Sequence, residues 1–135
     1  MQLPGSPAGA GSPPHLYSGE WRRKTGLISA HAGTAAVSDS KGASFTVQFT
    51  GRKFTWFTKQ GERSGKAQVL VNGRPDAVVD TYTADEIWGV GIYTKEFPSA
   101  GPHTVTISVL GEPGGPPGYS LGADVYLDGI RIERE

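Results

Sequence analysis

An all-β domain, an antiparallel β-sandwich of the jelly-roll type with eight or nine strands, is the fold class that the sequence predicts. Three observations carry this prediction. Twenty glycines and ten prolines among 135 residues interrupt the chain too often for long helices. Apolar and polar residues alternate with a period of two in several segments, and no helical stripe competes. These segments recur about every 8–12 residues, the spacing typical of sandwiches and jelly rolls.

The clearest strand signals are segments 45–49 and 105–109, each with three large apolar residues on one face. Segment 69–71 runs into Asn72-Gly73, a dipeptide that favours a tight hairpin because both turn positions need a positive φ. Further strands are predicted at residues 19–23, 27–37, 53–58, 77–81, 88–92 and 125–132. In segment 125–132 the apolar residues are Val125 and Leu127 before Asp128-Gly129 and Ile130 and Ile132 after it, so the alternation shifts by one residue. This shift predicts a bulge or a bend at Asp128-Gly129.

The N-terminal segment 1–17 differs in composition from the rest of the chain. It is rich in Gly, Pro, Ser and Ala, which bury too little apolar surface to repay the cost of ordering. We therefore expect a flexible tether at residues 1–17 and one sandwich domain at 18–135, linked to other domains of a longer protein. The tether has neither the charged start nor the apolar run of a signal peptide, and no apolar run is long enough for membrane insertion.

Charge and cysteine content argue against several classes of function. Thirteen basic and thirteen acidic residues give a formal net charge of zero. Nucleic acids and anionic membranes bind proteins with a basic excess, so neither is expected as a partner. The chain has no cysteine, which excludes disulfides, thiolate metal sites and thiol catalysis.

Two short motifs invite a catalytic interpretation and do not support it. Residues 118–122 match the G-x-S-x-G nucleophile elbow, which needs a strand before the serine, a helix after it and a histidine later in the chain. Here Gly-Pro-Pro precedes, a strand is predicted to follow, and the last histidine, His103, lies upstream. Residues 61–66 lack the spacing and the following helix of a phosphate-binding loop. We therefore expect residues 118–122 to form a loop and residues 61–66 to form a turn. We do not expect the protein to be an enzyme.

Short motifs follow one another in a characteristic order between residues 42 and 130. They are Gly42–Phe45, Phe49–Gly51, Gly65–Ala67, Val69–Gly73, Val79–Tyr82, Gly101–Val105 and Val125–Asp128. This order resembles bacterial modules of the galactose-binding-like jelly-roll superfamily, which includes many carbohydrate-binding modules of secreted glycoside hydrolases. The resemblance implies a non-catalytic module that targets a parent enzyme or surface protein to a glycan, in a secreted or cell-surface location.

The aromatic residues offer a second route to the same function. A sugar ring needs an aromatic platform for its C–H face and planar donors and acceptors for its hydroxyls. Trp88 is the first candidate, because it follows residues 83–86 at an expected junction of loop and strand. The predicted ligand-binding residues are Trp88, Tyr82, Tyr119, Trp21, Asp85, Glu86 and His31, with Arg22 and Arg63 as further donors. Packing in the core is the alternative role for each aromatic residue, and it is the role expected for Trp56.

Jelly-roll modules of this kind often hold a structural calcium ion between their first and last strands. Glu20 and Asp128 lie at those positions in this sequence, and carboxylates are the hard oxygen ligands that calcium prefers. The resemblance therefore implies a calcium site at Glu20 and Asp128. The alternative is that both are ordinary charges at strand edges.

A second class of function stays open beside sugar binding. The chain can equally be a structural or protein-interaction sandwich of a multidomain surface or phage-tail protein. Exposure of Trp88, Tyr82 and Trp21 around one concavity would favour sugar binding. Burial of all three would favour the structural alternative.

Overall fold

The computed structural model describes residues 15–25 and 34–134, and these residues form nine β-strands and no helix. In chain order the strands are β1 (His15–Ser18), β2 (Arg22–Thr25), β3 (Thr34–Ser38), β4 (Ser44–Gln60), β5 (Gly65–Val71), β6 (Arg74–Asp80), β7 (Ile87–Pro113), β8 (Val125–Leu127) and β9 (Gly129–Glu133). Every pairing between these strands is antiparallel. The predicted all-β class is confirmed. Within the described ranges there is no helical segment able to cross a membrane.

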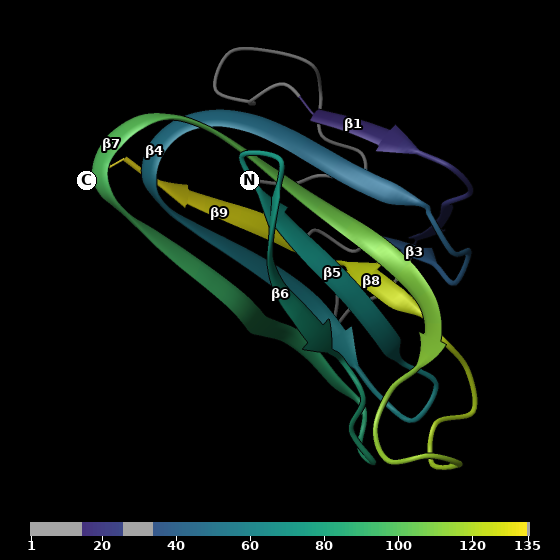
Figure 1. The fold of residues 1–135 in the computed structure, drawn as a ribbon. Helices are drawn as coiled ribbons and strands as arrows, with labels where there is room; N and C mark the ends of the chain where they lie inside the picture. The colour runs from purple at the N-terminus through teal and green to yellow at the C-terminus, as the bar shows by residue number, and fades with distance from the viewer. Residues whose placement is uncertain (1–14, 26–33, 135) are drawn as a thin grey trace.

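Two long, bent strands, β4 and β7, organise the fold (Figure 1). The first half of β4 pairs with β1 and with the second half of β7. Its second half pairs with β9 and with the first half of β7. The register breaks between Gly51 and Lys53, where both strands curve over. The bend folds one long ladder into two facing layers, so that a single pair of strands contributes to both sides of the sandwich.

The remaining strands extend these two layers. The larger sheet has the order β1-β4-β7-β5-β6, with β9 against the second half of β4, and the smaller sheet has the order β2-β3-β8. β8 and β9 are separated only by Asp128, whose amide donates to the Phe57 carbonyl (2.9 Å). At this residue the chain stops pairing with β3 and starts pairing with β4. The irregularity predicted at Asp128-Gly129 is thus a change of partner strand.

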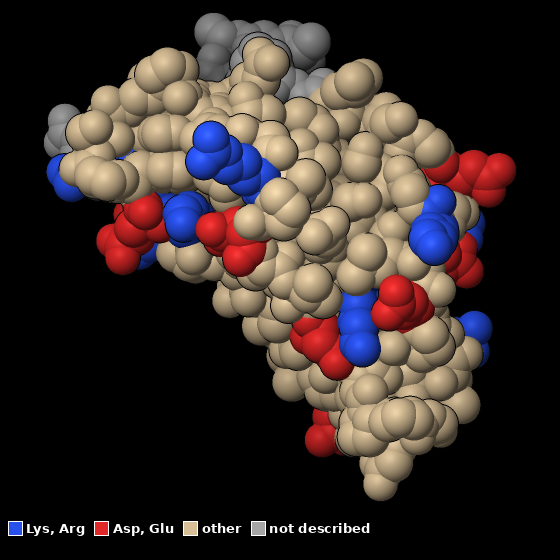
Figure 2. Space-filling model, in the orientation of Figure 1, with Lys and Arg blue, Asp and Glu red and all other residues tan. Residues whose placement is uncertain are grey.

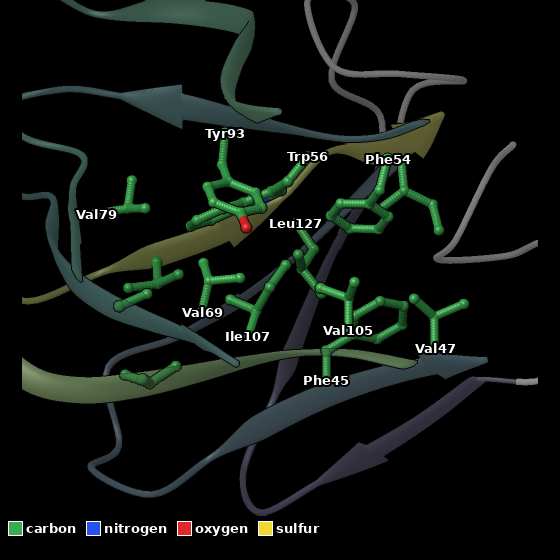
Figure 3. Packing of buried hydrophobic residues seen from close by; sticks show 14 of the residues in the cluster. Phe45, Val47, Phe54, Trp56, Val69, Val79, Tyr93, Val105, Ile107 and Leu127 are labelled. Atoms are coloured by element: carbon green, nitrogen blue, oxygen red, sulfur yellow. The ribbon is translucent and has the colours of Figure 1, made fainter. Parts of the chain in front are cut away.

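The core fills the space between the layers. Figure 3 shows the side chains of the two layers pointing toward one another, with Phe54 and Trp56 on one side and Phe45 on the other. All three are fully buried. The Trp56 indole Nε1 donates to the Tyr126 carbonyl (3.0 Å), so its polar atom is satisfied inside the core. The core role expected for Trp56 is confirmed.

The hairpin predicted at Asn72-Gly73 joins β5 to β6. Asn72 and Gly73 have φ values of 51° and 82°, the left-handed region that this turn requires. Two hydrogen bonds also hold the turn to β7. The main-chain N–H of Asn72 donates to the Thr104 carbonyl (2.7 Å), and the main-chain N–H of Thr104 donates to Asn72 Oδ1 (2.9 Å). The return strand begins at Arg74 rather than at residue 77.

Residues 98–102 contain two prolines and a glycine, which favour a turn between the predicted strands 88–92 and 105–109, but no turn forms there. These residues lie inside β7, at its bend, and join the predicted strands 88–92 and 105–109 into one. His103 therefore does not begin a strand. Its ring stacks on Phe97 with centroids 3.7 Å apart and an interplanar angle of 12°, and its Nδ1 lies 3.3 Å from Asn72 Nδ2.

The expected boundary of the N-terminal tether also needs correction. The composition places residues 15–17 in the tether, but with Ser18 they form β1. Ring contacts of Tyr17 with Phe45 (5.0 Å between centroids) and Trp21 (5.4 Å) provide the apolar packing that the composition did not suggest. The strand expected at 19–23 is shifted, because residues 19–21 form the turn that precedes β2. Residues 1–14 and most of the predicted strand 27–37 lie outside the described residues.

Candidate functional site

Three connections meet at one end of the sandwich, at the lower right of Figure 1. We call residues 61–64, 81–86 and 114–124 the loop end. Backbone hydrogen bonds join all three segments through the first: Thr83 N donates to Gly61 O (3.2 Å), Leu121 N to Glu62 O (2.7 Å) and Gly114 N to Ser64 O (3.1 Å). Because these connections are tied to one another, the side chains that they carry are held in place.

Tyr82 lies under the first part of the 114–124 segment. The Gly115 amide donates to Asp80 Oδ2 (2.8 Å), and the Tyr82 amide donates to Asp80 Oδ1 (3.0 Å). Gly115 has a φ of +71°, and a Cβ atom on it would lie 2.5 Å from the Tyr82 ring. Only glycine allows this approach, and as a result one part of the Tyr82 ring is covered. The ring is half-buried rather than an open platform.

Ser120, the serine of the G-x-S-x-G match, fastens the loop. Its Oγ lies within hydrogen-bonding distance of the carbonyls of Gly122 (2.8 Å) and Ser64 (2.9 Å). No strand runs directly into it, because β7 ends at Pro113, and the next element after it is the strand β8 rather than a helix. The prediction that this motif is a loop is confirmed.

Tyr119 and Leu121 flank Ser120 and point outward. Their exposed fractions are 62% and 63%, among the largest for apolar side chains of the described residues. Glu62 and Arg63, in the neighbouring turn, are also exposed. Figure 2 shows that the tip of this end is mostly uncharged on the face in view. An exposed aromatic ring with an adjacent guanidinium and carboxylate can stack on a sugar ring and hydrogen-bond to its hydroxyls.

Trp88 lies beside the loop end at the start of β7, in a cluster with Glu86, Lys59 and Tyr126. Its indole Nε1 donates to Glu86 Oε2 (3.3 Å), and its ring meets Tyr126 edge to face with centroids 5.6 Å apart. The Lys59 ammonium forms an ion pair with Glu86 (3.2 Å) and lies 5.5 Å from the centre of the Trp88 ring. Hydrogen bonding from Lys59 lowers the pKa of Glu86 below its ordinary value. These contacts fix the orientation of the Trp88 ring. Because the residue is only half-buried, part of the ring stays accessible.

The other predicted site residues have different positions. Asp85 is exposed in the 81–86 connection, where its amide donates to Thr83 Oγ1 (3.0 Å). Trp21 lies apart, in the turn between β1 and β2, where its Nε1 donates to Ser18 O (3.0 Å) and lies 3.2 Å from Ser44 O. His31 lies outside the described residues. The loop end therefore gathers Tyr82, Tyr119, Asp85 and Glu86, with Trp88 beside them.

Lys59 and Leu121 are among the residues of this region that the sequence did not indicate. Lys59 alternates with buried residues along β4, a position that normally indicates a solvated side chain. Leu121 follows Ser120 in a loop without periodicity. Only the folded chain shows that Lys59 reaches Trp88 and that Leu121 is exposed beside Tyr119.

The residues of the predicted calcium site do not form a coordination sphere by themselves. Glu20 is exposed in the turn after β1, whereas Asp128 is buried next to the second half of β4. A calcium ion takes about six to eight oxygen ligands, and the part of the chain that is described gathers no group of three or more acidic or histidine side chains. The calcium site stays a prediction from the resemblance. Thermal melting with and without a chelator tests it.

Comparison with known proteins places the fold. No protein-family model and no curated protein matches the chain. Among solved structures it is similar to a xanthan lyase from Paenibacillus (TM-score 0.62, 14% identity, 100% of this chain and 14% of that one). It is also similar to a family two carbohydrate esterase from Clostridium thermocellum in complex with cellohexaose. The TM-score is 0.51 and the identity is 16%, over 88% of this chain and 31% of that one. An exo-β-1,3-galactanase from Phanerochaete chrysosporium is a third such structure. Its TM-score is 0.50 and its identity is 21%, over 86% of this chain and 26% of that one.

The chain spans less than a third of the length of each of these enzymes. At identities this low the similarity concerns the fold. All three proteins act on carbohydrates by their names, and the chain has the fold of a segment of each. The expected likeness to jelly-roll modules of carbohydrate-active enzymes is thus confirmed at the level of the fold.

Proposed function

We propose that the chain is a non-catalytic carbohydrate-binding module that holds a parent enzyme or surface protein on a glycan, in a secreted or cell-surface setting. The observation that carries this proposal is the exposed Tyr119 ring on a segment fixed by backbone hydrogen bonds to its neighbours. The similarity of the fold to segments of carbohydrate-active enzymes supports it.

The loop end has the chemistry that sugar recognition needs. Tyr119 offers an apolar face for the C–H groups of a pyranose ring. Arg63, Glu62 and Asp85 offer planar donors and acceptors for its hydroxyls. Because the 114–124 segment is already ordered, binding loses little conformational entropy there. Trp88, held by Glu86 and Lys59, extends the aromatic surface at the edge of this end.

An open site of this kind binds weakly. One or two stacked rings and a few hydrogen bonds, exposed to water on one side, support affinities of micromolar or weaker, about −5 to −8 kcal/mol. Such affinity suits a module that keeps its parent near a polymer with many copies of the same sugar, since repeated weak contacts raise the overall avidity.

Charges of both signs are spread over the surface in view, and no extended basic face is visible in Figure 2. Figure 2 shows acidic and basic side chains next to one another on the visible face. The formal net charge is zero. A nucleic acid is therefore not proposed as a partner, because its phosphates require a basic excess.

A protein-interaction role is the alternative, and the exposed apolar side chains outside the loop end are the observation that bears on it. Leu16 on β1 and Val78 on β6 are 67% and 60% exposed. These strands end the larger sheet on opposite sides, so the two residues do not form one patch.

A glycan array with plant, bacterial and animal saccharides tests the proposal directly. We expect a small group of related glycans to bind, with calorimetry giving a dissociation constant in the micromolar range or above, and no cleavage of the ligand on long incubation. Release of shorter sugars would contradict the non-catalytic role. Absence of binding across the array would leave the protein-interaction role as the better account.

A further inference from the structure

A cleft lies at the open edge of the sandwich, where β1 borders the larger sheet and β2 borders the smaller one. It has a volume of about 330 Å³ and is lined by Tyr17, Gly19, Trp21, Arg22, Arg23 and Ala36. Ligand pockets have volumes of about 300–1,000 Å³, so this cleft is large enough for a small ligand such as one sugar ring. It is distinct from the platform at Tyr119.

The pairing of the strands explains why these side chains meet. Tyr17 pairs with Phe45, and Arg23 pairs with Ala36. Residues directly opposite each other on paired strands share a face of the sheet. Phe45 and Ala36 both belong to the core, so Tyr17 and Arg23 lie on the core-facing sides of their two sheets, toward the gap between them.

The aromatic side of the cleft is held by contacts within the chain. The rings of Tyr17 and Trp21 meet edge to face with centroids 5.4 Å apart. Carbonyl groups of Ser18 and Ser44 fix the Trp21 indole through its Nε1. Burial raises the pKa of the Tyr17 hydroxyl, and the positive charge of Arg23, which lines the same cleft, opposes this rise.

The two arginines of the cleft, Arg22 and Arg23, differ in whether a carboxylate pairs with them. Arg22 forms long, exposed ion pairs with Asp39 (3.5 Å) and Asp124 (3.8 Å). Arg23, also exposed, forms no ion pair with a carboxylate of residues 15–25 or 34–134. A guanidinium binds a carboxylate with two parallel hydrogen bonds. The cleft therefore combines an aromatic wall with a cation that has no anionic partner in the described structure.

We propose that this cleft binds an acidic sugar residue, with the carboxylate of a hexuronate on Arg23 and the C–H face of its ring against Trp21 and Tyr17. This inference rests on the proposed function and gives it a substrate class, an acidic polysaccharide or its end. The loop end would contact neutral residues of the same glycan or act alone.

The test compares uronate oligosaccharides with their carboxyl-reduced, neutral counterparts by calorimetry on the full chain at low salt. We expect the native chain to bind the acidic form about tenfold more tightly, which corresponds to about 1.4 kcal/mol. Arg23→Gln should abolish this preference, and Arg23→Lys should retain part of it because the charge remains. Arg74→Gln, an exposed arginine on the opposite edge strand β6, is the matched control and should keep the preference.

The outcomes separate this inference from the proposed function. Equal binding of acidic and neutral forms, or a preference that survives in Arg23→Gln, would overturn the cleft and leave sugar binding at the loop end in place. Loss of the preference in Arg74→Gln would overturn it as well, because the effect would then be one of general charge. If neither acidic nor neutral saccharides bind, both proposals fail. A preference that is lost in Arg23→Gln and kept in Trp88→Ala would assign the acidic residue to the cleft.

Discussion

Trp56 and Trp88 lie on paired strands, in the second half of β4 and the first half of β7. One is enclosed in the core, and the other is partly open to solvent. Trp56, in the second half of β4, is fully buried among apolar residues and donates its indole N–H to a main-chain carbonyl. Trp88, at the start of β7, is half-buried and donates to the side chain of Glu86 on the surface. The first packs the two layers together, and the second is held in place without being enclosed.

This difference shows how one sheet can supply both stability and recognition. A buried tryptophan contributes through the area that it removes from water. A tryptophan held by Glu86, Lys59 and Tyr126 loses little side-chain entropy when a ligand arrives, because its orientation is already fixed. We therefore expect changes at Trp56 to reduce stability and changes at Trp88 to reduce binding.

Trp56→Ala should give the largest effect. It leaves a cavity between the two layers and removes the donor to the Tyr126 carbonyl, so we expect a loss of about 3–5 kcal/mol in the free energy of unfolding. Urea unfolding followed by circular dichroism measures it. A loss below about 1 kcal/mol, within the range of ordinary surface substitutions, would contradict the core role of Trp56.

Trp88→Ala should act on binding instead. Loss of one aromatic surface should weaken the best glycan from the array by about 1–3 kcal/mol, with a much smaller change in stability than Trp56→Ala. Tyr119→Ala is the companion variant at the exposed ring, and Tyr119→Phe should bind almost as well as the native chain. Calorimetry on folded variants gives the answer. Unchanged affinity in both alanine variants would place the site elsewhere.

Gly115→Ala tests whether the 114–124 segment must be seated on Tyr82. The added Cβ is strained at a φ of +71° and would meet the Tyr82 ring, so the segment has to shift. We expect a loss of about 1–2 kcal/mol in stability and weaker glycan binding through displacement of Tyr119. Gly118→Ala is the control: its φ is also positive, at +86°, but its Cβ would meet no neighbour within 4 Å. If the two variants bind alike, the contact with Tyr82 does not organise the site.

Asp76 should give the smallest of these effects, and it should depend on pH. Asp76 on β6 accepts hydrogen bonds from the Tyr93 hydroxyl (2.5 Å) and Lys95 (3.1 Å) on β7. The hydrogen bond from Tyr93 is the main reason that the pKa of Asp76 lies below its ordinary value of 3.8. Its contribution to stability is therefore complete above pH 3.8 and decreases as the pH falls through the lower, folded pKa.

Asp76→Asn should cost less than about 1 kcal/mol at neutral pH, because the group is largely exposed. The variant should also lose less stability than the native chain on acidification. Unfolding curves between pH 2 and pH 7 measure both effects. Parallel pH profiles for the two proteins would show that Asp76 does not contribute.

Local sequence rules predicted the elements in which local physics decides the outcome. Alternation at residues 45–49 and 105–109 and the Asn72-Gly73 turn depend on neighbouring residues, and the structure contains all three. The bend of β7 depends instead on continuous pairing with β4. Proline and glycine at residues 98–102 indicate a turn when only the local sequence is considered, and the partner strand overrides that signal.

The candidate site shows the same division. The aromatic residues of the loop end could be named from the sequence, because Tyr82, Trp88 and Tyr119 stand next to expected loops. Their exposure could not, because it depends on distant residues. Gly115 covers Tyr82 from more than thirty positions away in the sequence, and Lys59 reaches Trp88 from another strand.

The three tryptophans allow one direct test of the account. Each indole N–H gives its own signal in a ¹⁵N-labelled sample: Trp88 reports on the loop end, Trp21 on the cleft at Arg23, and Trp56 on the core. On titration with the best neutral glycan, we predict shifts of the Trp88 indole and of amides in residues 81–86 and 114–124, while the Trp56 indole stays in place. A glycan that binds without moving the Trp88 indole or these amides would contradict sugar recognition at the loop end.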